Sequence, residues 1–256
     1  MSSVTEFPLV ITTALSPPPD VPYLALKKGK TRTRETLYSI VWWICKSEFE
    51  KIVIVETTGC DSVSIPLKSI AESCGKLLEF VAVENDNESV SRYGKGFGEG
   101  FALDAAFEKS SILQGSEGFF KCTGKIIVPN YMACIRQAKS KEFYFDAPRS
   151  LRNFVDTRFY FVSKKFWINN LRYSYKNVND YKGIFLEHVY FDSIARVGAI
   201  PFNPVAIRYC GTSGSSGDTY YVNLRLHIAR VVLRRGYGIY KWLRIQARHL
   251  AKREAI

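Results

Sequence analysis

Short apolar runs alternate with amphipathic segments in the first third of the chain, and this alternation constrains the fold more than any other feature. Three runs rich in branched residues have the length of single strands: 7–13, 51–56 and 77–83. The segment 33–46 carries apolar residues at helical spacing, and 65–74 is also predicted to be a helix. This order predicts parallel strands joined by right-handed crossovers, and therefore an α/β fold.

The carboxyl ends of the three predicted strands are polar. They are Thr12-Thr13, Glu56-Thr57-Thr58-Gly59 and Glu84-Asn85-Asp86-Asn87. Ligands of open α/β sheets bind beyond the carboxyl ends of the strands. We therefore expect a ligand site at this edge, with Thr12 and Glu56 among its residues.

Glycines occupy every second position from Gly94 to Gly100, before a predicted helix at about 101–109. The spacing is neither the GxGxxG of dinucleotide-binding folds nor the phosphate-binding P-loop, so both are excluded. The segment is predicted to be a flexible turn that opens the helix. Backbone amides and Lys95 could meet an anion there.

Later segments complete the expected domain. Residues 118–128 are predicted to form a strand, a turn and a second strand, and 154–162 one more strand. In 183–191, Glu187 interrupts an apolar and aromatic stretch. A Gly- and Ser-rich loop at 211–217 is expected to end a domain spanning 1–217.

Positive charge is concentrated in the C-terminal segment. Residues 222–256 hold nine Lys and Arg against one acid, Glu254, and so carry +8 of the net charge of +12. Apolar residues recur there at spacings of three and four, which predicts two amphipathic helices in 218–256, broken near Gly236 and Gly238. Such helices suit an anionic membrane surface, and a helix packed on the domain with a solvated basic face is the alternative.

Other classes of protein are disfavoured by what the chain lacks. No apolar run reaches 18 residues, so no membrane-spanning helix is expected. The N-terminus does not resemble a signal peptide, which favours a cytoplasmic location. Six scattered cysteines and three separated histidines do not suggest a disulfide scaffold or a metal site. No zinc-finger or RNP-like pattern supports a nucleic-acid partner.

The order of these features resembles the GT-A glycosyltransferases that build bacterial O-antigen and capsule chains. The resemblance covers roughly residues 7–217. Two motifs are similar to those of a smaller group of polysaccharide transferases, GKGxGE at 94–99 and FFKxTG[KR] at 119–125. The strand that ends in Asp-x-Asp and holds a metal in common GT-A enzymes has no counterpart here. The resemblance therefore implies a Rossmann-like mixed sheet and an enzyme that uses neither metal nor cofactor.

The resemblance also implies roles for individual residues. Lys95, Lys121 and Lys125 would hold the donor diphosphate, since cations can replace a metal opposite a leaving diphosphate. Glu187, partly desolvated by its apolar neighbours, would be the general base. The remaining candidate donor-binding residues are polar and lie at strand ends or helix starts: Thr12, Glu56, Glu99, Thr123, Asp156 and Arg158. Arg32 and Arg34 are interpreted as helix-end charges, with a phosphate contact as the alternative.

The implied reaction moves a sugar from a nucleotide-diphosphate donor to a hydroxyl of a lipid-linked O-antigen or capsule glycan. A UDP-sugar is favoured as donor, either UDP-galactofuranose or UDP-galactose, and inversion of configuration is expected. The enzyme would work at the cytoplasmic face of the membrane, held by its basic helices. Another nucleotide-using transferase, such as a nucleotidyltransferase, and a non-enzymatic adaptor that binds membranes or nucleic acid are the alternatives.

Overall fold

A computed structural model describes most of the chain. The described residues are 6–16, 29–84, 86–138, 141–146, 153–198, 205–212, 219–221, 225, 227–233 and 236. The loop predicted at 211–217 and the second predicted basic helix lie mostly or wholly outside these residues.

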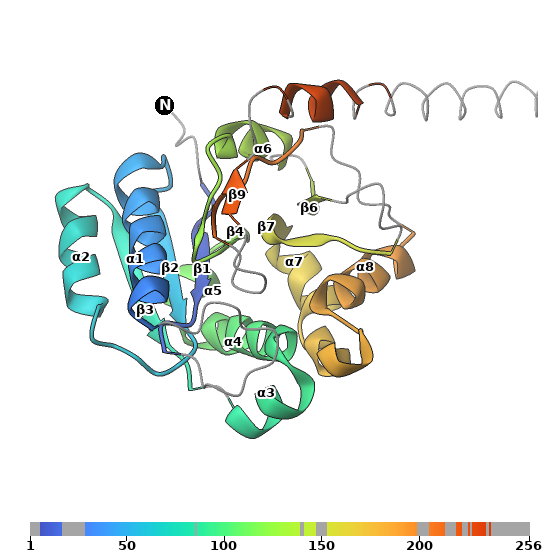
Figure 1. Cartoon of the computed structure of the whole chain (residues 1–256), viewed down its shortest axis with the longest axis horizontal. Coiled ribbons are helices and arrows are strands. Elements are labelled where there is room, and N and C mark those ends of the chain that lie inside the picture. Colours follow the sequence, from blue (N-terminus) through green and yellow to red (C-terminus); the bar gives the residue numbers. More distant parts are fainter. Residues whose placement is uncertain are drawn as a thin grey trace, which may run out of the picture.

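Six strands form the central sheet, in the order β3-β2-β1-β4-β7-β6 (Figure 1). Their bounds are β1 Leu9–Thr13, β2 Lys51–Glu56, β3 Leu77–Ala82, β4 Gly118–Thr123, β6 Phe143–Asp146 and β7 Asp156–Ser163. The first four strands are parallel, while β7 runs antiparallel to both β4 and β6. The predicted parallel strands and the mixed sheet are confirmed.

Helices and single helical turns flank this sheet. Their bounds are α1 Gly29–Lys46, α2 Ser64–Ser73, α3 Asn87–Tyr93, α4 Lys95–Lys109, α5 Ser111–Gln114, α6 Tyr131–Ala138, α7 Lys164–Phe166, η1 Trp167–Leu171, η2 Ser174–Asn177, η3 Asp180–Lys182 and α8 Leu186–Arg196. The helices predicted at 33–46 and 65–74 correspond to α1 and α2. The stretch around Glu187 begins helix α8.

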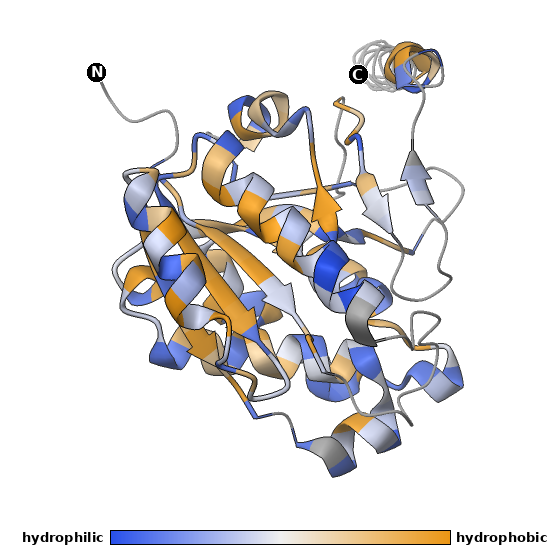
Figure 2. Ribbon diagram, turned by 60° about the vertical axis from the view of Figure 1, so that its left-hand side comes forward, coloured by the Kyte–Doolittle hydropathy of each residue, from blue (hydrophilic) through white to orange (hydrophobic). Residues whose placement is uncertain are grey.

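The central strands β1, β2 and β4 are buried on both faces along nearly their whole length, as their apolar sequences indicate. Ile52 and Ile54 of β2 face α1, α2 and α6, whereas Val53 and Val55 face α4, α5, η1 and α8. The strands are accordingly the most hydrophobic part of the ribbon in Figure 2, and the helices alternate apolar and polar residues. Two cores of similar size therefore fix the sheet between two helical layers.

A second, three-stranded sheet follows the carboxyl end of β4. It has the order β5-β8-β9, with β5 Ile126–Ile127, β8 Cys210–Thr212 and β9 Thr219–Tyr221. Residues 118–128 are therefore not one hairpin, because β5 pairs with β8 and not with β4. The prediction of two strands and a turn is confirmed, but the second strand belongs to another sheet.

The C-terminal segment begins with a helix, since residues 225 and 227–233 are helical. It lies at the margin of the molecule in both views, coloured dark red in Figure 1. Gly236, near the predicted break, is itself helical, because a helix tolerates a single glycine at a cost of about 1 kcal/mol. Within the described residues, no helix combines the length and hydropathy needed to cross a bilayer.

Candidate active site

The ends of β1, β2 and β4 meet at one edge of the sheet, as expected for a ligand site. Thr12 is in register with Thr123, and Thr13 is in register with Glu56. The backbone N–H of Gly124 donates to the carbonyl of Thr12 at 2.8 Å. A Cβ on Gly124 would lie 2.9 Å from that same oxygen, so only glycine lets the turn after β4 approach β1.

Glu56 is fully buried at this edge, and both carboxylate oxygens are occupied. One oxygen accepts from the N–H of Leu15 and the hydroxyl of Thr58, the other from the N–H groups of Thr58 and Cys60, all at 2.8 Å. These bonds tie the segment after β1 to the segment after β2. Glu56 lies where the resemblance puts a nucleoside contact, but its geometry is that of a residue that shapes the two loops.

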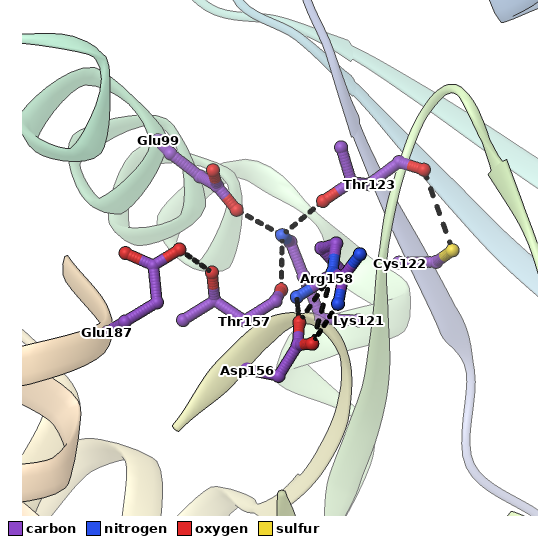
Figure 3. A network of polar contacts seen from close by, with 8 residues as sticks. All are labelled: Glu99, Lys121, Cys122, Thr123, Asp156, Thr157, Arg158 and Glu187. Carbon is purple, nitrogen blue, oxygen red and sulfur yellow. Dashed lines mark hydrogen bonds and ion pairs between the residues drawn. The ribbon is translucent and has the colours of Figure 1, made fainter. Parts of the chain in front are cut away.

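Lys121 is fully buried in β4, and its ammonium has three partners inside the protein (Figure 3). It forms an ion pair with Glu99 of α4. It also donates to the hydroxyl of Thr123 at 3.0 Å and to the carbonyl of Thr157 at 2.8 Å. Its charge therefore holds the carboxylate of Glu99 against the strand ends and is not presented outward to an anion.

Glu187 lies in the first turn of α8, and its carboxylate accepts a hydrogen bond from the hydroxyl of Thr157 at 3.0 Å. Burial raises the pKa of Glu187, and the negative charges of Glu99 and Asp156 raise it further. The hydrogen bond from Thr157 acts in the opposite direction. A desolvated carboxylate with a raised pKa fits the role of a proton acceptor.

Asp156 and Arg158 form a bidentate ion pair on β7. The guanidinium of Arg158 also lies over two aromatic rings, 3.9 Å from the centroid of Tyr209 and 4.6 Å from that of Tyr220. Burial alone would lower the pKa of Arg158, but Asp156 raises it overall. The pair therefore braces the small sheet against β7. Thr157, between them in sequence, points to the other face toward Glu187.

A group of three cations lies beside the turn that follows β4. Lys125, with 7% of its surface exposed, carries a pKa lowered to about 7, first by burial and then by the charges of Arg32 and Lys95. Arg32 is also buried, and its Nε donates to the carbonyl of Ala14 at 2.7 Å. Its Nη1 is buried without a hydrogen-bond partner among the described residues. Three cations from α1, α4 and the β4–β5 turn thus converge with one donor still unpaired, as an anion-binding site requires.

The glycine-rich segment is not a flexible turn, and the expectation of a turn at 93–100 is wrong. Helix α4 begins at Lys95, inside the motif, and Gly96, Gly98 and Gly100 are buried in it. A Cβ on Gly100 would lie 2.2 Å from Cβ of Tyr175. Gly94 adopts a φ of +102°, and a Cβ there would lie within 2.5 Å of Asp180. The glycines are needed because η2 and η3 pack directly on the helix.

Asp180 also occupies the amino end of α4. Its carboxylate accepts from the N–H of Gly96 at 3.2 Å. Burial raises the pKa of Asp180, whereas that hydrogen bond and the charge of Lys95 lower it. The backbone N–H of Gly96, at the segment predicted to bind an anion, therefore donates to a carboxylate of the protein itself. What the motif contributes to the site is the position of Glu99 and of the exposed Lys95.

Replacing Gly100 with alanine is expected to lower the free energy of unfolding by about 1–3 kcal/mol, because the added methyl group overlaps Tyr175. Urea denaturation followed by circular dichroism measures the change. Gly236→Ala is the matched control, since a Cβ there meets no atom within 4 Å. Equal stabilities of the two variants would contradict the close packing of α4 on η2.

Sequence reasoning missed several residues of this site. For Arg32 the sequence favours a helix-end charge, because nothing in the sequence indicates that Nη1 lacks a hydrogen-bond partner among the described residues. Thr157 could have been found from strand alternation, because it follows the candidate Asp156 on the opposite face of β7. Tyr209 and Tyr220 reach Arg158 only through the second sheet. Among the described residues, no group of three His, Cys, Asp or Glu is arranged to hold a metal ion.

Comparisons with known proteins found no matching family and no matching curated protein. Among the solved structures, 37 chains are similar, and three of them are described here. A protein described as a nucleotide-diphospho-sugar transferase from Desulfovibrio desulfuricans has 9% identity and a TM-score of 0.46, covering 76% of this chain and 77% of its own. A protein described as a glucose-1-phosphate thymidylyltransferase from Bacillus anthracis has 10% identity and a TM-score of 0.49, and the match covers 90% of this chain and 95% of that one. A 4-diphosphocytidyl-2C-methyl-D-erythritol synthase from Anaerococcus prevotii has 10% identity and a TM-score of 0.42, and the match covers 90% of this chain and 96% of that one. Likenesses of this size do not assign a function.

Proposed function

We propose that this chain is a glycosyltransferase that moves a sugar from a nucleotide-diphosphate donor to a hydroxyl acceptor. The observation that carries the proposal is the group of Arg32, Lys95 and Lys125, in which Nη1 of Arg32 has no hydrogen-bond partner among the described residues. A carboxylate with a raised pKa, Glu187, accepts from the hydroxyl of Thr157, whose carbonyl accepts from Lys121 of β4. The hydroxyl of Thr123, which lies two residues before Lys125 in the chain, accepts a hydrogen bond from Lys121. A leaving diphosphate needs cations, and an attacking hydroxyl needs a base.

Each group then has a chemical role in a single displacement. The three cations stabilise the charge that develops on the diphosphate as the glycosidic bond breaks, which a divalent metal does in other transferases. Glu187 accepts the proton of the acceptor hydroxyl as its oxygen attacks the anomeric carbon. Glu99, held by Lys121, supplies negative charge where the sugar ring becomes positive. Attack opposite the leaving group inverts the anomeric configuration.

Donor and acceptor follow from the sequence resemblance together with this site. A UDP-sugar is the favoured donor, with UDP-galactofuranose and UDP-galactose as the first two to test. A lipid-linked O-antigen or capsule glycan is the proposed acceptor.

Nucleotide binding in the presence of EDTA tests the donor site. In calorimetric titrations with UDP, GDP, CMP and dTDP, we expect one nucleotide to bind, and we expect it to bind equally well when EDTA is present. Arg32→Met and Lys125→Met are expected to weaken it at least tenfold, while Lys68→Met, at an exposed position of α2, leaves it unchanged. No binding of any nucleotide at millimolar concentration would overturn the proposal. Condensation of a nucleoside triphosphate with a sugar phosphate would instead identify a nucleotidyltransferase.

The lowered pKa of Lys125 predicts a pH dependence of donor binding. Bound diphosphate favours the charged ammonium and raises this pKa, so binding takes up a proton between about pH 7 and the raised pKa of the complex. Affinity for UDP is therefore expected to fall between pH 7 and 9, by up to about tenfold per pH unit. Lys125→Arg keeps its charge throughout this range and should give a flat profile. A falling profile in that variant would assign the titration to another group.

Membrane association is the second part of the proposal. Three apolar side chains of the helical C-terminal segment are about half exposed or more: Ile228 at 53%, and Val232 and Leu233 at 62% each. Arg225 and Arg230 are exposed on the same short helix, which matches the amphipathic pattern of lipid-binding helices. If the acceptor is lipid-linked, this helix would hold the enzyme at the membrane where the acceptor lies.

Sedimentation with lipid vesicles tests this association. Binding is expected to vesicles containing phosphatidylserine, and to decrease with salt and in the absence of anionic lipid. Substituting Ile228 and Val232 with serine should reduce it severalfold, whereas Leu77→Ser, at an exposed apolar residue of β3, should not. Equal binding of all variants would contradict a role for this helix.

A further inference from the structure

Two cysteines from different helices lie in contact at the surface. Cys45 is in the last turn of α1 and Cys74 directly follows α2, and their sulfur atoms are 3.5 Å apart. Both side chains are exposed and both thiols are free. The two helices end at the sheet edge opposite to the strand ends that carry the candidate active site. The pair is therefore separate from the chemistry proposed above.

The geometry is close to that of a disulfide but not equal to it. A disulfide joins its sulfur atoms at about 2.0 Å, so the two must approach by roughly 1.5 Å. Cys74 caps the carboxyl end of α2, where helices most readily adjust by a fraction of a turn. Elsewhere in the described chain, the thiol of Cys60 contacts the hydroxyl of Ser62, and that of Cys122 donates to the carbonyl of Ile126.

A lysine is fixed beside the pair. The ammonium of Lys76 donates to the carbonyl oxygens of Ser47 and Trp43 at the end of α1, and its charge acts on both thiols. Burial and the contact with Cys74 raise the pKa of Cys45, and Lys46 and Lys76 only partly offset this. The raised pKa makes Cys45 the less reactive of the two thiols, so the first reaction with an oxidant is assigned to Cys74.

We propose that Cys45 and Cys74 are an oxidation site that forms a reversible disulfide between α1 and α2. With hydrogen peroxide as oxidant, the Cys74 thiolate attacks one peroxide oxygen, and the O–O bond breaks to leave a sulfenic acid and hydroxide, which is protonated to water. The Cys45 sulfur then displaces the hydroxyl group as a second water and forms the S–S bond. The two thiols together lose two electrons and two protons. A dithiol reductant restores them by exchange.

Peroxide oxidation of the full chain tests the site. Intact-mass measurement is expected to show the loss of two hydrogens, and peptide mapping without reductant should join the peptides containing Cys45 and Cys74. The oxidised protein should unfold about 5–10 °C higher, because the link closes a loop of about 30 residues, and dithiothreitol should reverse the shift.

Single substitutions make the assignment specific. Cys45→Ser and Cys74→Ser should each abolish both the linked peptide and the shift in Tm. Cys60→Ser, at a half-exposed thiol elsewhere, should leave both unchanged. Accumulation of sulfenic or sulfinic acid in the unsubstituted chain without the linked peptide would overturn the proposal. Cross-linked dimers as the main product would overturn it as well.

Discussion

Replacing Glu187 with glutamine is expected to lower kcat for sugar transfer by a factor of about 10² to 10⁴, the usual contribution of a general base. An amide has the same shape as the carboxylate and can still accept the hydrogen bond from Thr157, but it cannot take up the acceptor proton. The effect should therefore appear in kcat, with donor affinity and folding stability nearly unchanged.

Initial rates with saturating donor and acceptor measure this effect. Glu72→Gln, at an exposed position of α2, is the matched control and should keep the full rate. Because Glu187 must be ionised to act, the rate of the unsubstituted enzyme should fall as the pH decreases through its raised pKa. Transfer by Glu187→Gln at more than a tenth of the normal rate would remove this residue from the chemistry.

Replacing Lys121 with methionine is expected to lower the free energy of unfolding by about 3 kcal/mol. The substitution keeps the length of the buried side chain but leaves Glu99 without its cation and the carbonyl of Thr157 without its donor. Glu99→Gln should cost at least as much, since it leaves a fully buried ammonium without a counter-ion. Both variants should also lose activity, because the carboxylate of Glu99 is no longer held in place in the first and is absent from the second.

Urea denaturation of the two single variants and of the double variant measures the coupling. The double variant should be more stable than the sum of the single losses predicts, since neither charge is left alone. Lys51→Met provides the control, being an exposed lysine of β2 in the same sheet. Additive losses would show that Glu99 and Lys121 do not act as a pair.

The alternation of strands and helices could be predicted because it rests on local patterns. Residues 52–55 are apolar without interruption, and only a strand covered on both faces buries such a run. The glycine-rich segment shows where local patterns mislead. Its composition favours a turn, but contacts with Tyr175 and Asp180, some 75 residues or more away in sequence, require the absence of side chains on a helix.

The candidate site was predictable in place but not in detail. Its edge of the sheet and most of its residues follow from the polar strand ends and the two motifs. The role of each charged residue cannot be predicted from these features, because Lys121 and Lys125 are four residues apart in one motif and have different surroundings. Lys121 is paired with the carboxylate of Glu99, whereas Lys125 is affected more by the charges of Arg32 and Lys95 than by that of Glu35.

What the amino-acid sequence determined by itself is the order of elements, the polar edge of the sheet and the basic C-terminal segment, since these depend on residues near one another in the chain. The tertiary structure alone decided that Arg32, Lys95 and Lys125 converge and that Glu99 meets Lys121. The physical reason is that charges act over a few ångströms of space, and the strand order and the close packing of α4 set which distant residues come that near.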